Sequence, residues 1–171
     1  PKYVEDGIPL VTSKNIYNGR LNLSNAKCIS KEDHQSISIR SGVARDDILF
    51  AMIGSVGNPV IIETDEEFSI KNVALFKYYG RSLIEPKYLL LFLKITSIEM
   101  KKAASGGVQS FVSLIYLRNY PVPIPPLSEQ KRIVSKANEL LALCDHLEEQ
   151  KKNCDTLGGQ LTSAVVTHLS I

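Results

Sequence analysis

The sequence predicts an α+β fold: a mostly antiparallel β domain with a few helices over residues 1–126, followed by a long C-terminal coiled-coil helix over residues 127–171. Short apolar runs separated by turn signals fill the first 80 residues, and they do not alternate with helical segments as the strands of a parallel sheet would. After a proline-rich segment at residues 121–126, the chain runs to its end without another proline. That composition allows one uninterrupted helix.

The strands are predicted from apolar runs and from the turns between them. Asn18-Gly19 favours a tight turn between two strands. The segment Ser36-Ile37-Ser38-Ile39 alternates with a period of two, which is typical of a half-buried strand. A glycine-rich stretch at residues 54–58 lies between two apolar runs and predicts a hairpin with a flexible tip. The predicted strands cover residues 8–11, 20–23, 36–39, 47–53, 60–62 and 73–76.

Two helices are predicted between the strands and the proline-rich segment. Pro86 suits the first turn of a helix, and residues 88–98 supply its apolar face. Residues 101–104 predict a second short helix, which the glycines that follow it would end.

The C-terminal helix is predicted to begin with Ser128 as its N-cap and Glu129 in its first turn, where a carboxylate favours the helix dipole. Its apolar residues follow spacings of four and three, which indicates a coiled-coil seam that needs a partner helix. Gly158-Gly159 destabilises a helix by about 2 kcal/mol relative to two alanines, so we expect the helix to kink or end there. The sequence does not decide whether the helix continues past these glycines. The predicted oligomerisation residues are Ile133, Ala137, Leu140, Cys144, Leu147, Cys154 and Leu161, with Val165 in the same phase.

Charge and cysteine content narrow the class of protein. Residues 1–126 hold 15 Lys and Arg against 12 Asp and Glu, while residues 127–171 hold 5 against 6. This mild excess permits nucleic-acid binding without requiring it. Three cysteines, an odd number, favour a reducing compartment, and no apolar run is long enough for a membrane span. We therefore expect a cytoplasmic protein, and because the chain begins at Pro1 we expect an N-terminal segment to precede it.

Polar side chains at predicted turns are the candidates for DNA contacts, since loops carry donors to phosphates and base edges. Each has a simpler interpretation as an exposed loop residue or as a hairpin tip. The candidate DNA-binding residues are Lys14, Asn15, Asn18, Arg20, Ser55, Lys71, Asn72, Lys101, Lys102 and Gln109.

Catalytic and metal-binding patterns are weak. Glu85-Pro86-Lys87 has a spacing found in nuclease sites, but a helix start explains it better. The sequence has neither a glycine-rich nucleotide fingerprint nor a zinc-ligand spacing of Cys and His. We therefore predict no enzyme, no metal site and no cofactor in this chain.

Several segments, in order, resemble the DNA-specificity (S) subunits of type I restriction–modification enzymes. Pro-Ile-Pro-Pro-Leu-Ser-Glu-Gln-Lys-Arg-Ile-Val, at residues 123–134, is similar to the junction between a target-recognition domain and a spacer helix in that family. Residues 46–57 resemble its Asp-Ile-Leu hairpin with a Gly-Ser-x-Gly tip. The other similar segments are residues 7–16, 72–76 and 105–109.

The resemblance implies a non-catalytic role in reading DNA. Each recognition domain of such a subunit reads one half of a bipartite site, and the helices set the separation of the halves. The partners implied are double-stranded DNA, methyltransferase (M) subunits and restriction (R) subunits. S-adenosylmethionine, ATP and magnesium would be bound by those partner subunits.

The chain departs from the family pattern because it has one recognition domain and one helix where two of each are usual. It is either half of a longer subunit or a half-length subunit that dimerises and reads an interrupted palindrome. Two other functions stay open: the C-terminal DNA reader of a fused restriction-methyltransferase, and a helix-mediated assembly subunit that binds no DNA.

Overall fold

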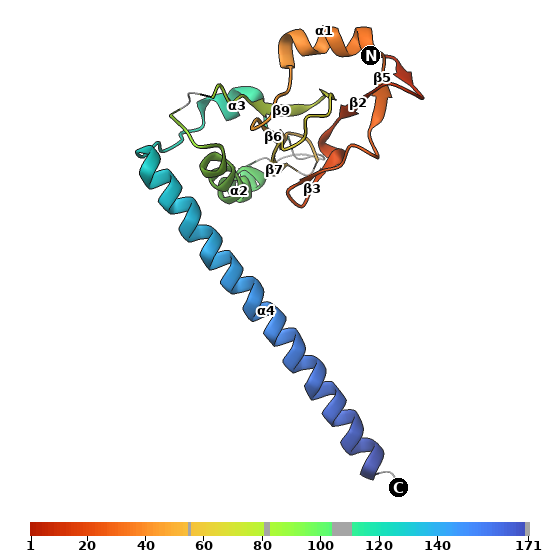
Figure 1. The fold of residues 1–171 in the computed structure, drawn as a ribbon, viewed down its shortest axis with the longest axis vertical. Helices are drawn as coiled ribbons and strands as arrows, with labels where there is room; N and C mark the ends of the chain where they lie inside the picture. Colours follow the sequence, from red (N-terminus) through yellow and green to blue (C-terminus); the bar gives the residue numbers. More distant parts are fainter. Residues whose placement is uncertain (55, 81–82, 104–110, 170–171) are drawn as a thin grey trace. The chain divides into compact units, whose positions relative to one another are not determined.

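The computed structural model describes residues 1–54, 56–80, 83–103 and 111–169, with only the backbone course at 103 and 164–169. Internal contacts divide the chain into two units, Pro1–Gln130 and Lys131–Ile171. The strands of the described residues lie in the first unit, and the second consists of the long helix α4 from Lys131 onward (Figure 1). The predicted fold class, α+β with mostly antiparallel strands and a long C-terminal helix, is confirmed.

A three-stranded antiparallel sheet forms the centre of the first unit. Its order is β7 (Gly57–Ile61), β6 (Ile48–Ala51) and β9 (Val73–Phe76). All four residues of β6 are buried, as the continuous apolar run predicts for a strand that is covered on both faces. Strand β6 pairs with β7 in antiparallel orientation, which confirms the predicted hairpin, although β7 starts at Gly57, earlier than expected.

A second sheet is built from the N-terminal part of the chain. Its order is β1 (Tyr3–Val4), β5 (Lys27–Ile29), β2 (Ile8–Val11) and β8 (Ser69–Ile70). The β2–β8 pair is the parallel exception to the predicted antiparallel pattern. Between β2 and β5 lie a short 3-10 helix, η1 (Ser13–Asn15), and a small hairpin, β3 (Ile16–Tyr17) with β4 (Arg20–Leu21).

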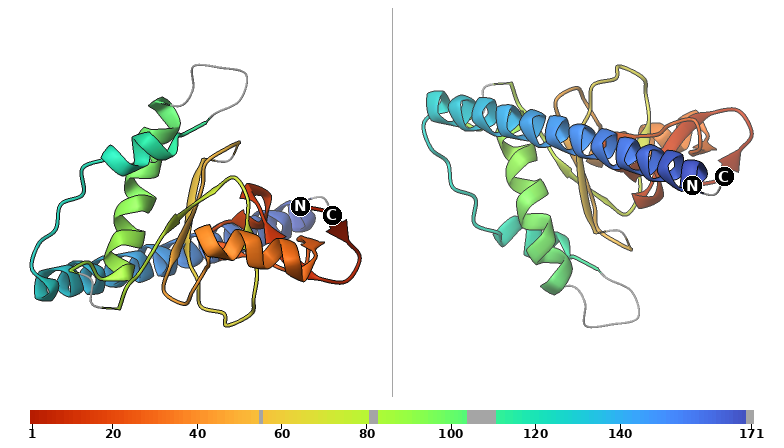
Figure 2. Two further views of the ribbon diagram at one scale, coloured as in Figure 1. Left: turned by 90° about the horizontal axis from the view of Figure 1, so that it is seen from above. Right: turned by 90° about the horizontal axis from the view of Figure 1, so that it is seen from below.

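The core has two layers because β6 alternates its side chains between two faces. Ile48 and Phe50 pack with Leu93 and Met100 of helix α2 (Pro86–Ala103) on one face. Leu49 packs with Val11 of β2 and other residues of the second sheet on the opposite face. Figure 2 shows α2 and the N-terminal sheet on opposite sides of the central strands.

The predicted strand at residues 36–39 is wrong, because these residues lie in helix α1 (Lys31–Ser41). The Oγ of Ser30 accepts a hydrogen bond from the backbone N of Asp33 at 3.2 Å and caps the helix, and Glu32 and Asp33 suit its first turn. None of residues 31–41, all of which the structure describes, is buried. The alternating Ser and Ile residues therefore have no buried sheet face to pack against, and the helix forms instead.

The predicted second short helix at residues 101–104 is also wrong, since residues 101–103 are the last residues of α2. Met100 is fully buried, so its contacts hold this part of the chain in the same helix, and residue 104 is outside the described residues. After the undescribed stretch, Val112 donates its backbone N–H to Met52 O at 3.0 Å, and α3 (Leu114–Asn119) follows.

Helix α4 (Leu127–Leu169) begins one residue before the predicted N-cap, so Ser128 lies inside its first turn. The carbonyl of Pro126 accepts from the backbone N of Glu129 at 2.9 Å and of Gln130 at 3.0 Å. The helix continues through Gly158 and Gly159, which answers the question that the sequence left open. None of the helices in the described part of the chain combines the length and the apolar character that crossing a membrane requires.

Candidate nucleic-acid interface

A polar pocket of about 230 Å³ lies where helix α2 meets two turns of the β-strands. The turn between β3 and β4 contributes Asn18 and Gly19, the start of β7 contributes Asn58 and Pro59, and α2 contributes Lys94 and Ser97. Lys94 is the single charged residue among these six. The pocket therefore presents positive charge and amide groups without an opposing carboxylate.

Backbone conformation shapes the first wall of the pocket. Asn18 and Gly19 have φ angles of 50° and 69°, and they join Tyr17 to Arg20 as a two-residue hairpin turn. This left-handed pair is the one that Asn-Gly favours, so the predicted turn is confirmed. A Cβ on Gly19 would lie 4.0 Å from Nζ of Lys94, which places the lysine ammonium next to the turn.

The second wall depends on the absence of a side chain at Gly57. Its φ is +99°, and a Cβ there would lie 2.8 Å from Cβ of Ser97 and 3.5 Å from Cε of Lys101. Glycine is required at this position by both the conformation and the contact. It allows the start of β7 to approach α2 closely enough to place Asn58 beside Lys94 and Ser97.

Helix α2 carries a stripe of lysines past the pocket. Lys87, Lys94 and Lys101 are exposed and follow at intervals of seven residues, so they lie on one face at steps of about 10.5 Å, with a drift of about 20° per step. The side chain of Ser97 is buried between two of them and donates to Lys94 O at 2.7 Å. The predicted DNA-binding residues include neither Lys94 nor Asn58, although the heptad spacing of the lysines could have revealed the stripe.

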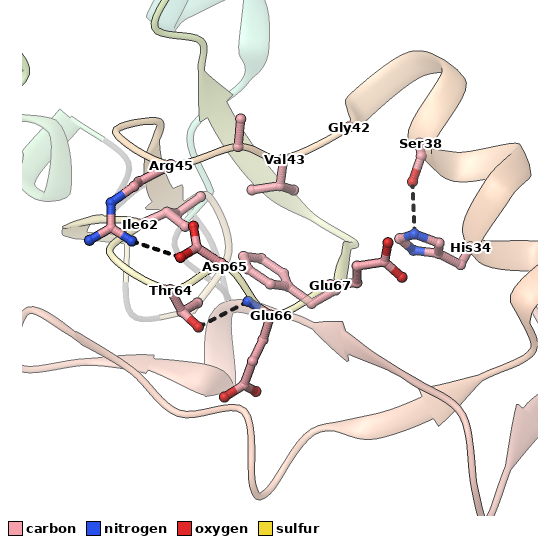
Figure 3. A pocket seen from close by; sticks show the side chains of 12 residues that line it. His34, Ser38, Gly42, Val43, Arg45, Ile62, Thr64, Asp65, Glu66 and Glu67 are labelled. Carbon is pink, nitrogen blue, oxygen red and sulfur yellow. Dashed lines mark hydrogen bonds and ion pairs between the residues drawn. The ribbon is translucent and has the colours of Figure 1, made fainter.

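A second pocket of about 280 Å³ has the opposite charge. Its lining includes Asp65, Glu66 and Glu67, with Arg45 as the one arginine (Figure 3). Arg45 pairs with Asp65 at 3.2 Å, so carboxylates outnumber cations at its rim. A polyanion would be repelled there, and we therefore assign the candidate interface to the pocket at Lys94.

The predicted DNA-binding residues fall into two groups in the structure. Asn18 lines the cationic pocket, and Arg20 follows it after the turn. Lys101 does not line the pocket, but its Cε would lie 3.5 Å from a Cβ on Gly57, and Lys102 is next along α2. Lys14, Lys71 and Asn72 form another group of exposed residues, because Ser13 Oγ donates to Asn72 O at 3.3 Å and so joins the two loops. Ser55 and Gln109 are outside the described residues.

Asn15 has a different place from the one that we predicted. It is 7% exposed, and its Oδ1 accepts from Thr12 N at 2.9 Å and from Thr12 Oγ1 at 3.0 Å. Its Nδ2 donates to Asn22 O at 3.4 Å. With its amide bonded inside the protein, Asn15 holds the loop that carries Lys14 and presents no amide to a ligand.

The predicted oligomerisation residues lie on α4. Ile133 and Ala137 are partly buried, and Leu140, Cys144, Leu147, Cys154 and Leu161 are exposed. Leu140, Leu147 and Leu161 expose more than half of their surface. The side chain of Val165 is outside the described residues. Among those described, Cys28, Cys144 and Cys154 are free thiols, and no group of three or more acidic, His or Cys side chains is placed to hold a metal ion.

Two solved structures share this fold. One, "Crystal structure of HsdS subunit from Thermoanaerobacter tengcongensis", has a TM-score of 0.61 at 21% identity and covers 86% of this chain and 33% of its own. The other, described as the structural basis of complex assembly and conformational transition of the type I R-M system, has a TM-score of 0.59 at 20% identity. It covers 85% of this chain and 34% of its own.

The chain belongs to the family described as type I restriction modification DNA specificity domain, which matches residues 3–154. The Escherichia coli type I restriction enzyme EcoBI specificity subunit is 27% identical over 165 residues, which are 95% of this chain and 35% of that subunit. The EcoAI specificity subunit of the same organism is 37% identical over 94 residues, 48% of this chain and 16% of that subunit. The resemblance seen in the sequence is confirmed, and the chain spans about a third of the EcoBI relative.

Proposed function

We propose that this chain recognises one half of a bipartite DNA sequence as the specificity part of a type I restriction–modification enzyme. The family match carries this proposal, because it runs from residue 3 to residue 154 and so includes the globular unit and more than half of α4. The cationic pocket supports it, since phosphate contacts supply a large share of the affinity of DNA-binding proteins.

Sequence specificity would come from amide and arginine side chains at the turns. Asparagine can pair with adenine through two hydrogen bonds, and arginine can do the same with guanine. Asn18 is the first residue of the two-residue turn, and Arg20 is the first residue of the strand that follows it; both are exposed. The lysine stripe on α2 would position the duplex without reading it.

Methyl transfer and cleavage would belong to M and R subunits, which would bind S-adenosylmethionine, ATP and magnesium. The names of the curated relatives, which are specificity subunits, support a non-catalytic role for this chain. A subunit that reads chromosomal DNA would act in the cytoplasm of a bacterial or archaeal cell.

Helix α4 would join two recognition domains. At 43 residues it is about 64 Å long, and half-sites one DNA turn apart are separated by about 34–36 Å. Its exposed leucines need a partner helix, supplied by a second half of the same subunit or by a second copy of this chain. In the second case the DNA target would be an interrupted palindrome.

Methylation mapping tests the proposal directly. Methylated bases would be mapped across the genome of the host, of a strain that lacks the gene and of the complemented strain. We expect deletion to abolish methylation at one bipartite motif and complementation to restore it. An unchanged set of methylated motifs would contradict DNA recognition, and a purified complex that binds no duplex at low salt would favour an assembly subunit. Methyltransferase motifs upstream in the same reading frame would instead favour a fused enzyme.

A further inference from the structure

We propose that the pocket between the Asn18-Gly19 turn, Asn58-Pro59 and α2 binds one backbone phosphate of the DNA, with Lys94 as the cation that holds it. It rests on the proposed function, since the phosphate is part of the recognised duplex. It goes further by assigning a single site on the protein to a single chemical group.

Lys94 differs from three lysines of the chain whose ammonium groups already have a partner. Lys77 pairs with Asp47 at 2.7 Å, Lys136 pairs with Glu139 at 2.8 Å, and Lys27 lies 5.0 Å from the ring centroid of Tyr3. Within the described residues no carboxylate pairs with Lys94, and no other charged group lines its pocket. An ammonium without a protein counter-ion can pair with a phosphate without first breaking an existing ion pair.

Glycines at two points shape the space around Lys94. A side chain at Gly19 would occupy the space next to Nζ of Lys94, and one at Gly57 would clash with Ser97. The backbone of Lys94 is also restrained, because Ser97 Oγ donates to Lys94 O at 2.7 Å. The side-chain amide of Asn18 adds neutral N–H donors on the other side of the pocket.

Size and lining favour a phosphate over an extruded base. A volume of about 230 Å³ would hold roughly eight waters at about 30 Å³ each, which accommodates the five heavy atoms of a phosphodiester with some of its water. Proteins that hold single bases stack them on aromatic or guanidinium planes. None of the six lining residues is aromatic or an arginine, whereas lysine is a compact point charge that suits phosphate.

Lys94→Gln tests this site without disturbing the fold, because the side chain is exposed. The matched control is Lys31→Gln, which removes an exposed lysine from α1, away from the pocket. Each variant would be made in the full-length subunit bound to its methyltransferase partner. Affinity for a duplex with the target site and for one without it would be measured by fluorescence anisotropy over a series of salt concentrations.

We expect Lys94→Gln to weaken binding to both duplexes by the same factor, about fivefold at 0.15 M salt, and to lower the slope of log K against log salt by about 0.9. Lys31→Gln should change neither. Circular dichroism should show the same helix content for both variants and the wild type.

Neutral methylphosphonates, placed one at a time in the target duplex, would then locate the phosphate. At one position the methylphosphonate should weaken binding of the wild type but not weaken binding of Lys94→Gln any further, since the variant has already lost the same contact. If every position weakens both proteins equally, if Lys94→Gln behaves as Lys31→Gln does, or if its base preference changes, the phosphate site is refuted. A wild-type complex that binds no duplex would refute the proposed function, whereas a site-specific wild type with an unaffected Lys94→Gln variant refutes this inference alone.

Discussion

Replacement of Gln130 by leucine is expected to destabilise the globular unit more than any exposed change on the same helix. Gln130 lies in the first turn of α4 and is fully buried. Its Oε1 accepts from Glu85 N at 2.8 Å, and its Nε2 donates to Leu83 O and to Pro125 O, both at 2.8 Å. One amide therefore ties the proline-rich segment to the chain just before α2.

The magnitude follows from these three hydrogen bonds. Each contributes about 1 kcal/mol net, and a group left buried without a partner costs about 1–3 kcal/mol. Leu83 is exposed and Glu85 and Pro125 are partly exposed, so water can reach some of the freed groups and the lower value applies. We expect Gln130→Leu to lower the free energy of unfolding by about 3 kcal/mol, since leucine has a similar volume and a similar helix propensity.

Urea unfolding, followed by circular dichroism, measures this loss. With a denaturant slope of about 2 kcal/mol per M, the midpoint should fall by about 1.5 M. The matched control is Gln150→Leu on the same helix, where the glutamine is exposed and its Nε2 lies 3.1 Å from His146 Nε2. That change should alter stability by less than about 0.5 kcal/mol.

Equal midpoints for Gln130→Leu and Gln150→Leu would refute this reasoning. They would mean that the three bonds of Gln130 are replaced by water at no cost. A third variant, Gln130→Glu, keeps the acceptor for Glu85 N–H but loses both donors and buries a charge. It should therefore be at least as destabilising as leucine at pH 7 and less so at pH 5, where a carboxyl with a pKa raised by burial regains a proton.

Four further changes test other parts of the structure. Asp47→Asn should lower the free energy of unfolding in urea by about 2–4 kcal/mol. The buried carboxylate accepts hydrogen bonds from Ala44 N at 2.8 Å, Tyr78 N at 2.8 Å and Lys77 Nζ at 2.7 Å. The control, Asp65→Asn in an exposed ion pair, should lower it by less than about 0.5 kcal/mol. Gly57→Ala should lower the free energy of unfolding by at least about 2 kcal/mol. The loss should exceed that of Gly80→Ala, because Gly80 also has a positive φ but no atom lies within 4 Å of a Cβ there. Equal losses would show that the contact with Ser97 does not contribute to the loss at Gly57. Leu140→Asp with Leu147→Asp should convert an oligomer to monomers by light scattering, whereas Asn138→Asp with Thr156→Asp should leave it intact; an oligomer that survives the leucine changes is held elsewhere. Lys101→Ala with Lys102→Ala should weaken binding to all duplexes and flatten the salt dependence, and an altered base preference would show that these lysines do more than contact phosphate.

Local patterns predicted the elements whose signals are independent of their neighbours. Asn18-Gly19 predicted its turn because both residues tolerate a left-handed backbone. The apolar runs on either side of residues 54–58 predicted the hairpin of β6 and β7. Residues 36–39 misled because a period of two is informative only when one face is buried, and α1 buries none of its residues. The better signal was the Ser30 cap, three residues before Asp33.

The candidate interface was only partly predictable. Asn18 and Lys101 were chosen from polar turns and glycine-rich loops. The structure places Asn18 in the lining of the cationic pocket and Lys101 one heptad after Lys94 on α2. Lys94 was not predicted, because it lies inside an apolar helical segment, where a single lysine is usually interpreted as a solvent-exposed residue with no role in binding. Asn15 was chosen as one of the polar residues clustered around a predicted turn. Its amide is hydrogen-bonded to Thr12 and Asn22, and no local pattern distinguishes such an asparagine from an exposed one.

The sequence by itself determined the class of fold, the long helix that follows the proline-rich segment and the family, because these depend on residues close together in the chain. Only the tertiary structure decided which polar residues share a site. The pocket at Lys94 joins residues 18–19, 58–59 and 94–97, and these meet because Gly57 lets β7 lie against α2 and because α2 packs on the buried face of β6. Such contacts depend on the packing of distant segments, which the spacing of residues along the chain does not encode.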